Sequence, residues 1–108
     1  MKIVNVDDNN FDLEVYQSKL PVLLEFGADW CAPCKRQLPL LEKFASTNAD
    51  KVKVCKIDID DAPVITAKLK VKSVPTLILF NGGEQVGSKV GLTTLAEIDN
   101  FVLTKIGS

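Results

Sequence analysis

Apolar and polar residues follow one another along the chain in two kinds of segment. Residues 22–26 are apolar at almost every position, which is typical of a strand covered on both faces. Between 34 and 46, apolar residues recur three or four positions apart, which predicts a helix with one buried stripe. In chain order, the pattern predicts strands over 2–6, 22–26, 52–59, 76–80 and 85–90, and helices over 11–19, 34–46 and 63–69, with a last helix after 94.

The residues between these segments predict how the helices begin and where one of them bends. The asparagines at 9–10 and Asp61 are expected to cap the first and third helices through their side-chain oxygens. Thr94 and Glu97 have the spacing of a capping box at the start of the last helix. Pro39 lies inside the second helix and lacks an N–H, so we expect a kink there.

The order of the elements predicts an α/β fold. Strands and helices alternate through the first part of the chain, which favours parallel strands joined by crossover helices. Asn81, Gly82 and Gly83 then predict a hairpin, and with it an antiparallel edge. We therefore expect a central mixed β-sheet flanked by helices on both faces. The length of 108 residues predicts a single domain over residues 1–108.

Charge and composition narrow the range of functions. Thirteen basic and fourteen acidic residues leave a net charge of -1, which gives no electrostatic basis for binding nucleic acid. No apolar run approaches the length of a membrane span. The first residues lack the apolar segment of a signal peptide, so we expect a cytoplasmic protein with reduced thiols. The sequence contains no histidine, which excludes Ser-His-Asp and Cys-His catalytic arrangements.

Two of the three cysteines form a closely spaced pair. Cys31 and Cys34 stand between the strand 22–26 and the following helix, and residues three apart on a first helical turn have Cα atoms about 5–5.5 Å apart. That separation lets a disulfide open and close with little movement of the backbone. Cys31 lies at the helix N-terminus, where the macrodipole favours a thiolate, so we expect it to be the nucleophile. Cys34 lies on the apolar stripe, where it stays protonated, and is expected to resolve the mixed disulfide.

Two other interpretations of this pair remain open at this point. The cysteines could be unrelated core thiols, although their place between a strand and a helix favours redox chemistry. They could also be half of a zinc site, but only Cys55 could add a third thiolate and no histidine could complete the set. We therefore expect no metal, and we assign Cys55 no role beyond that of a small buried side chain.

The chain resembles the thioredoxin family almost from end to end. The resemblance rests on the active-site stretch FGADWCAPCK at 26–35, Pro39, the strand KIDID at 56–60, the loop SVPT at 73–76, the hairpin FNGGE at 80–84, and Gly91. It implies a thioredoxin fold and a thiol–disulfide oxidoreductase that reduces protein disulfides through a reversible Cys31–Cys34 disulfide. It also implies no bound cofactor, and a thioredoxin reductase as the partner that returns the electrons.

The resemblance implies supporting roles around the two cysteines. Glu25 takes the place of the family's buried aspartate and would accept the proton of Cys34, with Lys56 near its charge. Without the resemblance, Glu25 could equally face solvent from an edge strand, and a lysine on a strand is most often solvated. Ala32 and Pro33, between the cysteines, would tune the redox balance, and Ala32 stands where most members have glycine.

A substrate surface is implied beside the cysteines. Trp30, Val74, Pro75 and Gly91 match the positions at which the family contacts its substrates, and Gly27 replaces an aromatic residue found in many members. An X–Pro bond is ordinarily trans. The resemblance nevertheless implies a cis Val74–Pro75 bond, which leaves the Val74 backbone free to pair with an extended substrate segment.

Two rival functions remain on the same fold. An enzyme that forms or isomerises disulfides would have a higher reduction potential, and a non-catalytic subunit would use the surface for docking alone. The absence of a signal peptide and of a histidine between the cysteines argues against the first, and the intact cysteine pair argues against the second. We expect a monomer that acts on disulfide-containing proteins and binds neither nucleic acid nor membrane.

Overall fold

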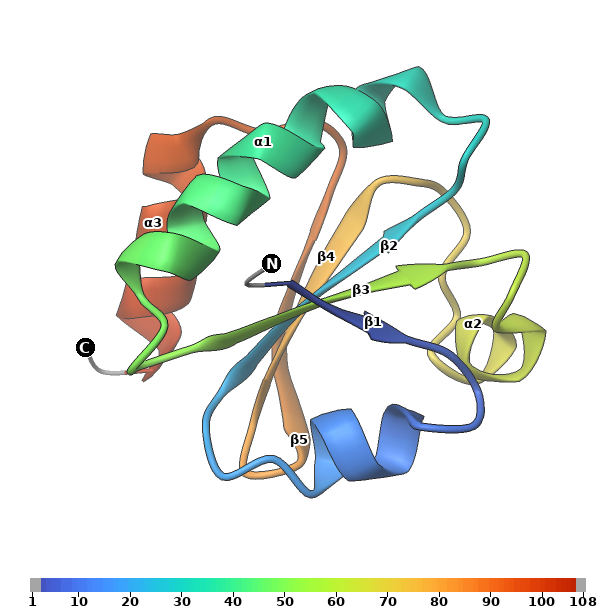
Figure 1. Ribbon diagram of the computed structural model, residues 1–108, viewed down its shortest axis with the longest axis horizontal. Coiled ribbons are helices and arrows are strands. Elements are labelled where there is room, and N and C mark those ends of the chain that lie inside the picture. The colour runs from blue at the N-terminus through green and yellow to red at the C-terminus, as the bar shows by residue number, and fades with distance from the viewer. Residues whose placement is uncertain (1–2, 107–108) are drawn as a thin grey trace.

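In the computed structural model, which describes residues 3–106, five strands form one sheet, and three α-helices and a short π-helix cover it (Figure 1). The strands are β1 Ile3–Val6, β2 Val22–Gly27, β3 Lys53–Asp58, β4 Thr76–Asn81 and β5 Glu84–Val90. The helices are the π-helix η1 Asp12–Tyr16, α1 Ala32–Thr47, α2 Pro63–Lys68 and α3 Leu95–Ile106.

The strands lie in the order β1-β3-β2-β4-β5. β1 and β2 both run parallel to β3, whereas β4 is antiparallel to β2 and to β5. The predicted mixed sheet is therefore confirmed. Because β2 occupies the centre, Glu25 has Lys56 of β3 on one side and Leu77 of β4 on the other.

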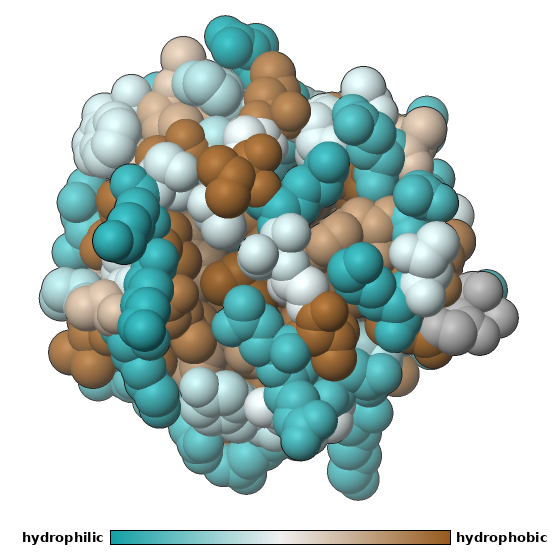
Figure 2. All heavy atoms as spheres, turned by 180° about the vertical axis from the view of Figure 1, so that it is seen from behind, coloured by the Kyte–Doolittle hydropathy of each residue, from teal (hydrophilic) through white to brown (hydrophobic). Residues whose placement is uncertain are grey.

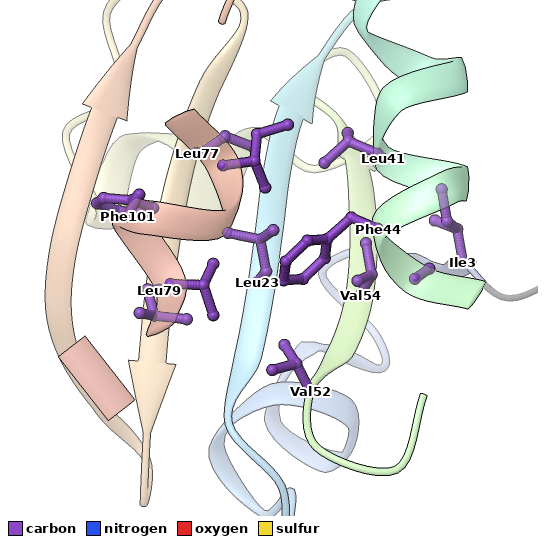
Figure 3. Close-up of a cluster of buried hydrophobic side chains, with 12 residues drawn as sticks. Ile3, Leu23, Leu41, Phe44, Val52, Val54, Leu77, Leu79 and Phe101 are labelled. Atoms are coloured by element: carbon purple, nitrogen blue, oxygen red, sulfur yellow. The ribbon is translucent and has the colours of Figure 1, made fainter. Parts of the chain in front are cut away.

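Side chains of the central strands alternate between two apolar clusters, one on each face of the sheet. Leu23 of β2 belongs to a cluster that also contains Phe44 of α1 and Phe101 of α3 (Figure 3). Leu24, the next residue, belongs to the other cluster, which includes residues of η1 and α2. Figure 1 shows the same division, with α1 and α3 on one face and η1 and α2 on the other. Both faces of β2 are buried, as the continuous apolar run predicts.

The predicted first helix, 11–19, is wrong in its length and in its cap. Only η1 is helical there, and Phe11 at its N-terminus makes no side-chain cap hydrogen bond. Asn10 Oδ1 instead accepts the Asp7 N–H at 2.7 Å, and Asp7 Oδ1 accepts the N–H groups of Asn9 and Asn10. These short-range bonds close a turn, so they compete with a helix cap for the same side chains.

The predicted cap of α2 is also wrong. Asp8, not Asp61, accepts the N–H groups of Val64 and Ile65, at 3.1 and 2.9 Å. The N-terminus of α2 is therefore satisfied by a side chain from the loop after β1, which local spacing cannot identify.

The other predicted elements are present, with ends shifted by one or two residues. The capping box is confirmed, since Thr94 Oγ1 accepts the Glu97 N–H and Glu97 Oε1 accepts the Thr94 N–H, both at 3.1 Å. Pro39 lies inside α1, and the kink stays a prediction. Lys2, in the first predicted strand, lies outside the described residues.

Candidate active site

Cys31 and Cys34 lie where β2 leads into α1. Cys31 is the N-cap residue of α1, and Cys34 is in its first turn. The two residues are joined as a disulfide, with their Cα atoms 5.3 Å apart, which is the separation expected from their helical spacing. Both side chains are nearly buried, with 5% of Cys31 and 6% of Cys34 exposed.

The start of α1 favours negative charge on the Cys31 sulfur. The Cys34 N–H donates to Cys31 Sγ at 3.2 Å, and this N–H belongs to the first turn, whose donors have no partner inside the helix. The helix macrodipole acts in the same direction. Pro33 occupies the first turn, where its missing N–H costs no intrahelical bond. After reduction, these groups favour the thiolate of Cys31.

Glu25 is buried in the sheet, and 4% of it is exposed. The alternative that it faces solvent from an edge strand is therefore wrong. Burial raises the pKa of Glu25 to about 7, against the opposing effects of a hydrogen bond from Gln37 and of the positive charge of Lys56. A carboxyl group with this pKa can hold or release a proton near neutral pH.

Gly27 lies between the Glu25 carboxyl group and Cys34. A Cβ built on Gly27 would lie 3.4 Å from Glu25 Oε1 and 3.4 Å from Cys34 Sγ. The two atoms therefore cannot be farther apart than twice that distance, and both face the same opening. The missing side chain at this position leaves the space between the acid and the sulfur open.

That space belongs to a cavity of about 610 Å³ between the ends of β1, β2 and β3 and the start of α1. Glu25, Cys34 and Lys56 line it together. Lys56 is half-buried and pairs in register with Glu25 on the adjacent strand. The structure thus brings together the two cysteines, the acid and the lysine named from the sequence.

Gln37 is a member of this group that the sequence analysis missed. It is completely buried in α1, and its Nε2 donates to Glu25 Oε2 at 2.8 Å. Its Oε1 accepts the Thr93 N–H at 3.0 Å. The signal that could have identified it is a glutamine one helical turn after Cys34, on the buried side of the helix.

The loop that precedes β4 lies against the disulfide. Val74 packs against the cluster formed by Ala28, Cys31 and Cys34. The Val74–Pro75 bond is cis, as the resemblance implies, and the Pro75 carbonyl accepts the Gly91 N–H at 2.8 Å. Val74, Pro75 and Gly91 are therefore next to one another at the site.

Trp30 lies beside the disulfide on the surface, and 67% of it is exposed. Its indole N–H donates to Asp60 Oδ2 at 2.9 Å, which fixes one edge of the ring. Val90 and Leu92, on both sides of Gly91, are also exposed apolar residues. The sequence did not identify Val90, Leu92 or Asp60 as part of this surface, because neither exposure nor a long-range hydrogen bond can be recognised from it.

Cys55 lies apart from this group. It belongs to the apolar cluster on the opposite face of the sheet from α1, together with Leu24 and Phe26. Burial raises the pKa of its thiol to about 12. Among residues 3–106, no group of three or more histidine, cysteine, aspartate or glutamate side chains could hold a metal ion.

Comparison with known proteins agrees with this geometry. The family model described as "Thioredoxin" matches residues 2–104. The chain belongs to the thioredoxin family. The thioredoxin of Rickettsia bellii (strain RML369-C) is 47% identical over 88 residues, which cover 82% of this chain and 84% of that protein. The thioredoxins of Acidithiobacillus ferridurans, 38% identical over 93% of both chains, and of Haemophilus influenzae, 37% identical over 94% of both chains, are also similar.

Membership of the thioredoxin family, together with a cysteine pair at disulfide distance, identifies the chain as a thiol–disulfide oxidoreductase. Its active-site motif, Trp30-Cys31-Ala32-Pro33-Cys34, has the WCxPC form of the family. In the described part of the chain, no helix combines the length and the apolar character needed to cross a membrane.

Proposed function

We propose that the chain reduces disulfide bonds in other proteins, with its Cys31–Cys34 dithiol as the electron donor. The observation that carries the proposal is the position of Cys31 Sγ, which accepts the N–H of Cys34 at the start of α1. A helix N-terminus lowers the pKa of a cysteine thiol and so favours the thiolate, which is the nucleophilic form.

The reduction has two steps. The Cys31 thiolate attacks one sulfur of the substrate disulfide and forms a mixed disulfide, and the other substrate sulfur leaves as a thiolate that takes up a proton. Cys34 then loses its proton to Glu25 and attacks Cys31 Sγ, which releases the second substrate sulfur. The substrate gains two electrons, and the chain is left with the Cys31–Cys34 disulfide.

Glu25 is suited to accept that proton because its pKa of about 7 matches the working pH of a general base. The opening at Gly27 supports transfer from Cys34, either directly or through one water. Lys56 would stabilise the carboxylate while the thiol is deprotonated. Ala32 and Pro33 would tune the redox balance from their place between the cysteines.

The substrate would lie across Trp30, Val74, Pro75 and Gly91. Trp30 offers an exposed apolar face, and Val74 is in contact with the disulfide cluster. The proposal is that an extended segment of the substrate pairs with the Val74 backbone in the manner of an added strand.

The electrons would come from a thioredoxin reductase, as is general in the family, and the chain itself would hold no cofactor. We place the protein in the cytoplasm and treat residues 1–108 as one domain that acts as a monomer. On the face that Figure 2 shows, apolar patches are interrupted by hydrophilic side chains.

The test is the reduction of insulin disulfides by wild type and by Cys31→Ser, with the chain held reduced by a chemical dithiol. We expect Cys31→Ser to lose more than about 10³-fold in rate, because the nucleophile is removed. Cys55→Ala is the matched control, since it deletes a thiol on the other face of the sheet, and it should retain the wild-type rate.

Equal rates for wild type and Cys31→Ser would contradict the proposed function. The direction of electron flow is checked by the reduction potential of the Cys31–Cys34 couple. A value near -270 mV, which is the general figure for thioredoxins rather than one deduced from this chain, supports a reductant. A value near -120 mV would instead indicate an enzyme that forms disulfides.

A further inference from the structure

Gln37 connects the proposed proton acceptor to a distant segment of the chain. It lies in α1 one turn after Cys34 and is completely buried. Its side-chain amide makes two hydrogen bonds in opposite directions, one to Glu25 on β2 and one to the backbone of Thr93, between β5 and α3.

The Thr93 bond fixes which end of the amide faces Glu25. A backbone N–H can only donate, so it must bind the carbonyl oxygen of the Gln37 amide. The NH₂ group is then directed at Glu25 Oε2, 2.8 Å away. Rotating the amide by half a turn would place an oxygen against Glu25 Oε2 and a donor against the Thr93 N–H, so both bonds would be lost.

The two oxygens of Glu25 are thereby separated in function. Oε2 is held by Gln37, whereas Oε1 lies at the opening beside Gly27, at the same distance as Cys34 Sγ from the point where a Cβ would lie. A quarter turn of the carboxyl group about its terminal bond would break the Gln37 bond, and a half turn would only exchange its two oxygens. The free oxygen is therefore kept directed toward the sulfur.

We infer that Gln37 is a positioning residue for the oxidoreductase reaction: it anchors one oxygen of Glu25 to the Thr93 backbone and so presents the other oxygen to Cys34. The inference rests on the proposed role of Glu25 as proton acceptor, and it adds a residue that does not itself touch the substrate. Because Thr93 follows Gly91 by two positions, the anchor lies next to the proposed substrate surface.

The hydrogen bond from Gln37 also favours the ionised form of Glu25. The other groups that face this carboxyl group are Lys56 on β3 and Cys34 on α1, and its neighbour on β4, Leu77, is apolar. Lys35 and the aspartates Asp7, Asp29, Asp58 and Asp61 line the same cavity. All of these groups are still present when Gln37 is replaced, so a change in the pKa of Glu25 can be assigned to the loss of Gln37.

The deciding measurement is the pKa of Glu25 in Gln37→Met, followed by the ¹³C signal of its carboxyl carbon in the oxidised protein. Methionine keeps a similar shape but removes both hydrogen bonds. A hydrogen bond to a charged group is worth enough to move a pKa by about one unit, so we expect an upward shift of about that size. A pKa that stays within about 0.3 unit of the wild-type value would overturn the inference, since it would show that the bond has no hold on Glu25.

Gln37→Glu provides a second variant of nearly the same shape, in case the methionine variant does not fold. Its carboxyl group can still accept the Thr93 N–H, but it meets Glu25 with like charge. The two carboxyl groups should then titrate as a coupled pair with at least one apparent pKa raised above that of Glu25 in wild type. Two independent titrations at ordinary values would overturn the inference.

Leu41→Ala is the matched control for loss of packing, because Leu41 is buried in the same helix one turn later and its side chain has no group that could hydrogen-bond to Glu25. It should lower the stability and leave the pKa of Glu25 unchanged; a shift equal to that of Gln37→Met would overturn the inference. The insulin assay separates this result from the proposed function. The rate of insulin reduction is measured against pH for wild type and Gln37→Met. If the pKa of Glu25 moves in Gln37→Met but the acid limb of this pH–rate profile does not, the positioning role stands and the role of Glu25 in the reaction fails.

Discussion

Ionisation of Glu25 costs free energy, because its carboxyl group is buried at the centre of the sheet. In the folded protein the Glu25 carboxyl group stays protonated up to a pH of about 7, whereas in the unfolded chain it loses its proton near 4.5. Folding therefore takes up a proton between these values, and the free energy of unfolding falls as the pH rises through this interval. Below pH 4.5 the group has no such effect. The proposed proton acceptor thus weakens the fold above neutral pH.

Glu25→Gln should therefore be more stable than wild type at pH 8.5 and equally stable at pH 4. The shift from 4.5 to about 7 corresponds to roughly 3–4 kcal/mol at the higher pH, since each pKa unit is worth about 1.4 kcal/mol. Urea unfolding of the oxidised proteins across this range measures the difference, and oxidation keeps the titration of Cys31 and Cys34 out of the result. A stability difference that does not change with pH would contradict the raised pKa.

Helix α2 is held at its N-terminus by a side chain from another part of the chain. It spans only Pro63–Lys68, too short to be stable by itself, and Asp8 accepts the first N–H groups that would otherwise lack partners. The carboxylate also interacts favourably with the positive end of the helix. The loop after β1 and the helix α2 therefore stabilise each other.

Asp8→Ala should lower the free energy of unfolding by about 1 kcal/mol, the usual cost of losing an N-cap side chain. Asp61→Ala is the matched control, because it removes an exposed aspartate at the position that the sequence pattern favoured, and it should change stability by less than about 0.5 kcal/mol. Urea unfolding of both variants at pH 7 gives the comparison. Equal losses would show that Asp8 does not act as the cap.

The elements follow from the sequence where the signal is local. The apolar run at 22–26 and the helical periodicity of 34–46 depend on neighbouring positions, so both the strand and the helix could be predicted. The cap from Asp8 and the anchor at Gln37 could not, because each acts on a backbone N–H 56 positions away, on Val64 and Thr93 respectively.

The same limit applies to the active site, where only the features with a local sequence signal could be predicted. The Cys31–Cys34 spacing and its place between a strand and a helix are local features, and they indicate the redox pair. Burial is not local, so Glu25 could be read as solvated until the sheet order placed it between β3 and β4. Gln37 was missed for the same reason, since only the packing of α1 on β2 gives it a partner.

At the scale of the molecule, the sheet separates two kinds of thiol. Cys31 and Cys34 lie at one end of β2, whereas Cys55 lies within the apolar cluster on the face opposite α1. With its pKa raised to about 12, Cys55 has roughly one molecule in 10⁴ as thiolate at pH 8. In the oxidised native protein we therefore expect no reaction with a thiol reagent on the timescale of minutes, and one labelled thiol per chain in denaturant. Mass spectrometry counts the labels, and rapid labelling of the native protein would contradict the burial of Cys55.

The position of Cys55 has a further use. Because its sulfur is buried in the apolar cluster, labelling of Cys55 requires an opening of the fold that exposes it, and the labelling rate reports such openings. In the oxidised protein, the labelling rate of Cys55 is thus a measure of how often the native state opens. This measurement leaves the Cys31–Cys34 disulfide intact, because Cys55 lies on the other side of the sheet.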